Sequence, residues 1–225
     1  MKLKINESYT YYAGYGSLVN PMWAKQSVPD LKDFTMCTLK GYRRVFGKVH
    51  PHCIYRGEAN FDTMEIAACF VEPAEDYTLM VSSFMVPETA IEEIRQRECD
   101  YKQAKVMLDP GGDDLIQEGN IFVGYDSDDE MPEGPEKTYA HWPWFREKYQ
   151  GPTYRDDILP SQSYLKRCLD AHAQQSPEAL DNFMDTSFLA DRKTTIRQHV
   201  ANLGWTREDY TNTDVPTPPE TKGSA

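Results

Sequence analysis

Runs of apolar residues, rich in β-branched, aromatic and cysteine side chains, predict six strands in the first 125 residues of the chain. The predicted strands are residues 8–15, 34–49, 64–71, 77–86, 102–108 and 120–125. The first strand ends at a tight loop, Gly14-Tyr15-Gly16-Ser17, and Asn20-Pro21 then predicts the start of a short helix. These strands favour a sheet that is buried on at least one face.

The apolar period changes to that of a helix at Pro87, and residues 87–98 are predicted to be helical. Three further helices are predicted in the last third of the chain, over residues 161–173, 176–188 and 191–203. Residues 131–157 show no clean period and are left unassigned. The order of elements indicates an α+β fold class, with a sheet that curls toward a barrel and a helical C-terminal segment.

The composition indicates one globular domain over residues 1–210, followed by a tail that is rich in Thr, Pro and Glu. Such a composition predicts disorder for the tail, residues 211–225. Neither a membrane-spanning apolar run nor a signal peptide is visible in the sequence, so a cytoplasmic location is expected.

The chain carries 24 Lys and Arg residues against 36 Asp and Glu residues, a formal net charge of −12. This charge makes nucleic acid and anionic membranes poor default partners. One local basic cluster, formed by Lys40, Arg43, Arg44 and Lys48, is expected to lie along a solvated strand edge. The five cysteines include no Cys-x-x-Cys pair, so they are expected to be reduced thiols, mostly in the core.

The loop Tyr15-Gly16-Ser17-Leu18 is the first candidate for chemistry. A glycine between a strand and a helix lets the backbone approach a ligand closely, and exposed amides there suit a carboxylate or a phosphate. The loop has neither of the usual phosphate-binding patterns, so an ordinary strand-to-helix turn is the alternative.

Glu98 is the second candidate. It follows Ile91 and Ile94 at helical spacing, which puts its carboxylate on the apolar face of the predicted helix. Partial desolvation there raises a carboxylate pKa toward neutrality and suits a general acid–base catalyst. The alternative is a helix-end glutamate that pairs with Arg95 or Arg97 and faces solvent, and the spacing alone leaves both interpretations open.

Several other polar residues were considered as ligands or catalysts. The segment His50-Pro51-His52 is interpreted as a polar turn, because no further metal-ligating residue lies at a suitable spacing. Cys99 is not assigned as a nucleophile, because no histidine partner is apparent nearby. Candidate hydrogen-bonding groups, each with the alternative of an ordinary core or cap residue, are Tyr101, Tyr125, Ser161 and Tyr164.

Taken in order, four segments resemble the γ-glutamylcyclotransferase-like (AIG2-like) family. They are AGYGSLVNP (13–21), LKGYRRVF (39–46), RQRECDYKQAKV (95–106) and SYLKRCLDAHA (163–173). The resemblance implies a small mixed β-barrel with flanking helices. It also implies that the loop formed by Tyr15, Gly16, Ser17 and Leu18 binds a γ-glutamyl group.

The same resemblance matches Glu98 to the family's catalytic glutamate, and Tyr101 and Tyr125 to two of its tyrosines. The implied reaction is attack of the substrate's own α-amine on its γ-carbonyl, which releases 5-oxoproline and an amine. Because both reacting groups belong to one small molecule, neither a metal nor another cofactor is expected.

The sequence also departs from the family pattern. The loop continues Leu-Val-Asn-Pro without the tryptophan of the glutathione-specific branch, and the aromatic segment 139–149 has no recognised counterpart. Glutathione, a γ-glutamyl amino acid and a γ-glutamyl amine therefore all remain open as substrates, and the oligomeric state is not indicated. Two other classes stay open: a non-catalytic module that binds a γ-glutamyl group or an acidic metabolite, and an interaction protein.

Overall fold

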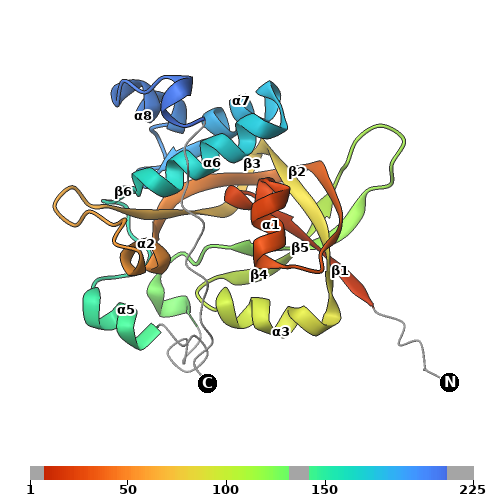
Figure 1. Ribbon diagram of the computed structural model, residues 1–225, viewed down its shortest axis with the longest axis horizontal. Coiled ribbons are helices and arrows are strands. Elements are labelled where there is room, and N and C mark those ends of the chain that lie inside the picture. Colours follow the sequence, from red (N-terminus) through yellow and green to blue (C-terminus); the bar gives the residue numbers. More distant parts are fainter. Residues whose placement is uncertain (1–7, 132–141, 212–225) are drawn as a thin grey trace.

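A mixed sheet of seven strands lies at the centre of the part of the chain that the structure describes (Figure 1). In the computed structural model, which describes residues 8–131 and 142–211, the strands are adjacent in the order β4-β5-β1-β3-β2-β7, and β6 pairs with β3. Most neighbours are antiparallel, whereas β1 with β5, β2 with β7 and β3 with β6 are parallel. The strands are β1 (Tyr9–Gly14), β2 (Lys32–Val49), β3 (Glu65–Pro87), β4 (Lys102–Leu108), β5 (Gln117–Val123), β6 (Leu159–Pro160) and β7 (Ser187–Leu189).

The sheet curls until its two ends approach each other. Thr38 on β2 and Asp109, just after β4, exchange backbone hydrogen bonds of 2.7 and 3.0 Å. The interior of the curl is filled by aliphatic side chains from every long strand, among them Leu39, Val81 and Ile121. The predicted α+β fold class with a small mixed barrel is therefore confirmed.

Helices cover both faces of the curled sheet (Figure 1). The α-helices of the described residues are α1 (Pro21–Ser27), α2 (Pro51–Tyr55), α3 (Glu88–Arg97), α5 (Trp142–Lys148), α6 (Gln162–Gln175), α7 (Pro177–Thr186) and α8 (Ile196–Asn202). Helices α6, α7 and α8 lie together on one side, and α3 lies on the opposite side. None of the helices over residues 8–131 and 142–211 is both long and apolar enough to cross a membrane.

The two strands predicted over residues 64–71 and 77–86 are halves of one strand, β3. The pairing of β3 with β2 shifts in register between Lys40 and Tyr42, beside Gly41, whose φ is +80°. The middle of β3 is largely exposed there, so polar residues interrupt the apolar pattern without ending the strand.

The last predicted helix begins five residues later than expected. Asp191 does not start it, because its carboxylate accepts hydrogen bonds from the amides of Lys193 and Thr194 in a turn. The helix cap is Thr195, which forms a capping box with Gln198. The predicted tail, residues 211–225, falls almost wholly outside the described residues, as do residues 132–141 of the unassigned segment.

Candidate active site

A cavity of about 410 Å³ lies where β1, α2, α3 and α6 meet. Its lining brings together most of the residues predicted to form a site: Tyr15, Gly16, Ser17, Leu18, Glu98 and Tyr101. Tyr164, a candidate hydrogen-bonding group, lines it as well, whereas Ser161 lies at the cap of α6 outside it. Glu98 and Tyr164, which follow Tyr15 by about 80 and 150 positions in the chain, thus line the same cavity as Tyr15.

The Tyr15–Leu18 loop leaves β1 and enters a single 3₁₀ turn, η1 (Ser17–Val19). Two of its carbonyl oxygens accept hydrogen bonds from side chains of the sheet. Ser82 Oγ donates to Leu18 O at 2.9 Å, and Arg44 Nε donates to Tyr15 O at 2.7 Å. At Gly16 an added Cβ would lie 2.7 Å from Tyr164 Oη, so glycine permits the close approach of α6. The loop is therefore held in one conformation against the cavity.

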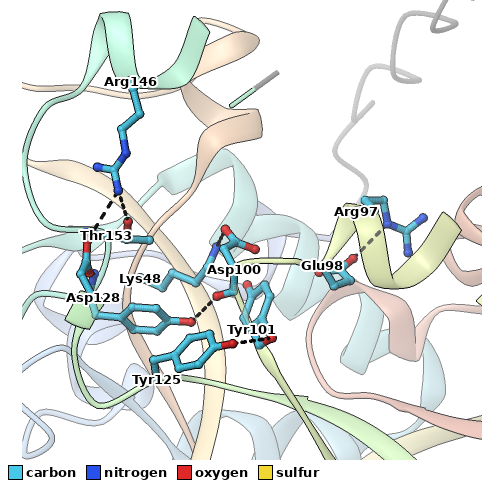
Figure 2. Close-up of polar contacts among 10 residues, drawn as sticks. Lys48, Arg97, Glu98, Asp100, Tyr101, Tyr125, Asp128, Arg146 and Thr153 are labelled. Atoms are coloured by element: carbon cyan, nitrogen blue, oxygen red, sulfur yellow. Dashed lines mark hydrogen bonds and ion pairs between the residues drawn. The ribbon is translucent and has the colours of Figure 1, made fainter. Parts of the chain in front are cut away.

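Glu98 follows the last residue of α3, at the helix C-terminus. Ile91 and Ile94 are buried as predicted, and Glu98 lies with Ile94 in the cavity lining. Its side chain is 25% exposed, and its Oε1 accepts from Arg97 Nε at 3.0 Å (Figure 2). Both features considered for Glu98 are thus present: a carboxylate on the cavity wall and an ion pair with a neighbouring arginine.

A buried ion pair lies beside Tyr101. Lys48 Nζ is 2.5 Å from Asp100 Oδ2 and 4.3 Å from the centre of the Tyr101 ring (Figure 2). Lys48 and Arg44 are 2% and 0% exposed, so the predicted solvated basic edge is wrong for these two residues. β2 is not an edge strand at Arg44, because it pairs with both β3 and β7 there, and each of the two side chains has polar partners in the interior.

Three tyrosine hydroxyls around the cavity are held in the protonated form. Burial raises the pKa of Tyr15, Tyr101 and Tyr164 well above the ordinary value of 10.0, and neighbouring groups raise it further. At neutral pH each hydroxyl is a hydrogen-bond donor. Such donors can stabilise negative charge that develops on a bound substrate.

His50 and His52 also line the cavity, which the sequence analysis did not anticipate. The expected turn is instead the start of α2, with Pro51 at its first position. Burial lowers the pKa of His50 well below 6.5 and that of His52 to about 4, so both rings are neutral at pH 7. In residues 8–131 and 142–211 no three His, Cys, Asp or Glu side chains are grouped to hold a metal ion.

Tyr125, which is also predicted to contact substrate, is not among the residues that line the cavity. Its hydroxyl donates to the backbone oxygen of Tyr101 at 3.4 Å (Figure 2). Its ring packs on that of Tyr154, with 6.0 Å between the centroids. Tyr125 is 8% exposed and lies behind Tyr101. Tyr125 therefore supports Tyr101, which does line the cavity.

Comparison with solved structures reveals the same fold in other proteins. One structure, described as a gamma-glutamyl cyclotransferase, has a TM-score of 0.54 and 8% identity, and the match covers 87% of this chain and 98% of that chain. An uncharacterized protein from Homo sapiens has a TM-score of 0.51 and 11% identity, covering 76% of this chain and 82% of that one. The chain therefore has a γ-glutamylcyclotransferase-like fold, as the sequence resemblance implied.

Sequence comparisons add nothing further, because neither a protein-family model nor a curated protein matches the chain. At these low identities the structural likeness establishes the fold alone.

Proposed function

We propose that this chain, which has the γ-glutamylcyclotransferase-like fold, is a γ-glutamylcyclotransferase with Glu98 as its general base and acid. The observation that supports it is the single cavity shared by Glu98, the Tyr15–Leu18 loop and Tyr101. A fold alone does not define a reaction, so the proposal depends on these side chains.

In the proposed reaction the Glu98 carboxylate accepts a proton from the α-ammonium group of a bound γ-glutamyl compound. The freed amine attacks the γ-carbonyl carbon, and a new C–N bond closes a five-membered ring. The tetrahedral intermediate then collapses and breaks the bond between the γ-carbon and the departing nitrogen. Glu98 returns its proton to that nitrogen. The attacking nitrogen releases its second surplus proton to the departing amine or to solvent, so that 5-oxoproline and the amine in its ammonium form are the products.

The cavity supplies what this reaction demands of a protein. Nucleophile and electrophile belong to one molecule, so the main requirement is to hold it in a folded conformation. The protonated hydroxyls of Tyr15, Tyr101 and Tyr164 are suitable donors for the oxyanion of the tetrahedral intermediate. Neutral His50 adds no charge that would compete with the substrate ammonium.

Release of 5-oxoproline from glutathione, γ-glutamyl-alanine and γ-glutamyl-ethylamide tests the proposal. We expect at least one compound to be converted, and Glu98→Gln to lower kcat by about 100-fold or more, because an amide cannot transfer the proton. Glu93→Gln is the matched control, since Glu93 lies on the same helix and is exposed.

Full activity in Glu98→Gln would reject this assignment of the catalyst. If wild type converts none of the compounds, the proposed activity itself fails.

A non-catalytic binding module is the second candidate, and the Arg97–Glu98 ion pair favours it. A carboxylate that already forms an ion pair with a guanidinium can serve as a fixed polar part of a binding wall. Tight binding of γ-glutamyl-alanine without release of 5-oxoproline would support this alternative.

A further inference from the structure

The charged groups around the cavity are more positive than the chain as a whole. The whole chain has a formal charge of −12, whereas the side chains of the described lining that are charged at pH 7 are four bases, Lys48, Arg56, Arg97 and Arg167, and two acids. The two acids, Glu98 and Asp100, are each paired with a base of the same lining. Arg56 and Arg167 are left without an acidic partner inside the cavity.

Arg167 has hydrogen-bonding capacity that the protein does not use. It is 6% exposed, and one terminal nitrogen donates to Glu58 Oε2 at 3.0 Å. Its Nε is buried and has no hydrogen-bond partner among the described residues. A buried N–H without a partner is destabilising, so the described part of the protein does not satisfy this guanidinium fully.

Arg56 lines the same cavity as Arg167, together with His50. Arg56 is half-buried, and no described residue forms an ion pair or hydrogen bond with its side chain. Trp23, whose ring centre is 6.0 Å from Arg167 Cζ, adds an aromatic surface next to them.

We infer that Arg56 and Arg167 form a subsite for a carboxylate on the departing half of the substrate. This inference rests on the proposed function. A γ-glutamyl amino acid or peptide has two carboxylates and one ammonium, whereas a γ-glutamyl amine lacks the second carboxylate. Two arginines without an acid in the cavity complement the additional negative charge, and a guanidinium is well suited to bind a carboxylate. The favoured substrate class is therefore a γ-glutamyl amino acid or γ-glutamyl peptide.

A matched pair of substrates tests the subsite: γ-glutamyl-alanine and γ-glutamyl-ethylamide differ only in the carboxylate of the departing amine. We expect wild type to favour γ-glutamyl-alanine in kcat/KM by roughly 10- to 100-fold. Arg56→Gln should remove most of this preference by lowering kcat/KM for γ-glutamyl-alanine alone. Lys25→Gln, on an exposed residue outside the cavity lining, should leave the preference intact.

Arg167 is tested in the double variant Glu58→Gln/Arg167→Met, so that no unpaired Glu58 carboxylate remains, and the same selective loss is expected. An equal loss for both compounds in the arginine variants would overturn the inference, because the arginines would then bind the γ-glutamyl carboxylate itself. Equal kcat/KM values in wild type would overturn it as well.

Binding to wild type and to Glu98→Gln, measured by calorimetry, separates the two proposals. If neither compound is converted, the proposed reaction fails. The subsite is then still supported if γ-glutamyl-alanine binds at least about 10-fold more tightly than γ-glutamyl-ethylamide and Arg56→Gln abolishes the difference. Equal affinities of the two compounds would reject the subsite.

Discussion

Gly16 lies in the Tyr15–Leu18 loop, in close contact with α6. An added Cβ at this position would lie 2.7 Å from Tyr164 Oη and 3.6 Å from Cys168 Sγ. Tyr164 has little freedom to withdraw, because its ring packs on His50 and Phe46 with centroids 4.8 and 6.1 Å apart. A single methyl group there affects both the loop and one of the proposed hydroxyl donors.

Gly16→Ala is expected to lower kcat/KM by about 10-fold or more and to destabilise the fold by about 1–3 kcal/mol, because the Tyr164 ring must move. Release of 5-oxoproline and urea unfolding measure the two effects. In Gly16→Ala/Tyr164→Phe the clashing oxygen is absent, so stability should recover in part while activity stays low. Wild-type activity in Gly16→Ala would contradict the tight contact.

His52 makes stability depend on pH. Burial, with the nearby charges of Arg56 and Lys48, lowers its pKa from 6.5 to about 4, and Asp100 opposes this shift. The unfolded chain takes up a proton below pH 6.5, whereas the folded protein does so only near pH 4. The free energy of unfolding should therefore fall as the pH drops through this window, by up to about 1.4 kcal/mol per pH unit.

Urea unfolding at pH 7.0 and 5.0 checks this expectation in wild type and in His52→Gln. Wild type should lose more stability than the variant between the two pH values. Part of the loss should persist in the variant, because burial lowers the pKa of His50 and His172 as well. Identical losses in both proteins would show that His52 does not titrate in this window.

At the scale of elements, β2 carries two consecutive arginines that point to opposite faces of the sheet. The Arg43 side chain is 23% exposed and pairs with Glu72 on β3. Arg44 is fully buried, and its guanidinium donates to Tyr15 O, to the Met80 carbonyl and to Thr186 on α7. Burial lowers the pKa of Arg44 to about 10, so it remains charged at neutral pH and connects the Tyr15–Leu18 loop, the sheet and α7.

Arg44→Met is expected to reduce the free energy of unfolding by about 1–3 kcal/mol, because buried carbonyl oxygens lose their donor. It should also lower activity, since Tyr15 is no longer fixed from behind. Arg43→Met is the matched control and should cost less than about 1 kcal/mol. Chemical unfolding of both variants compares them, and equal losses would disprove the assigned difference.

At the scale of the whole molecule, the buried Lys48–Asp100 ion pair connects β2 to the segment between α3 and β4. This segment carries Glu98 and Tyr101, and the backbone oxygen of Asp100 also accepts from Tyr154 Oη at 2.6 Å. The pair thus connects the side of the cavity that carries Glu98 and Tyr101 to β2. Because both charges are at most 7% exposed, neither is readily solvated when its partner is removed.

Lys48→Met alone is expected to destabilise the protein by about 3–5 kcal/mol, because it leaves the Asp100 carboxylate buried and unpaired. Lys48→Met/Asp100→Leu should recover most of that stability, while kcat stays reduced if the pair positions Glu98. Denaturation of the two single variants and the double variant completes a double-mutant cycle. Additive effects would show that the two groups are not coupled.

Local patterns in the sequence predicted much of the fold. The apolar period placed β1, β2 and α3 within a few residues, and Asn20-Pro21 predicted the start of α1, where the Asn20 side chain accepts from the Met22 amide. The continuous course of β3 was not predicted, because exposure of its middle mimics a turn. The late start of α8 was missed because Asp191 forms a turn of its own.

The sequence by itself identified candidate residues such as Gly16 and Glu98. A glycine between a strand and a helix, and a glutamate at helical spacing from two isoleucines, are both recognised from the neighbouring sequence. Only the tertiary structure decided which of them meet: Glu98 and Tyr101 line a cavity with the Tyr15–Leu18 loop, whereas Tyr125 lies behind it. Burial decides this outcome, and burial depends on strand order and on helices far along the chain. For the same reason neither the burial of the Lys48 ammonium nor the unpaired N–H of Arg167 could be predicted from local sequence patterns.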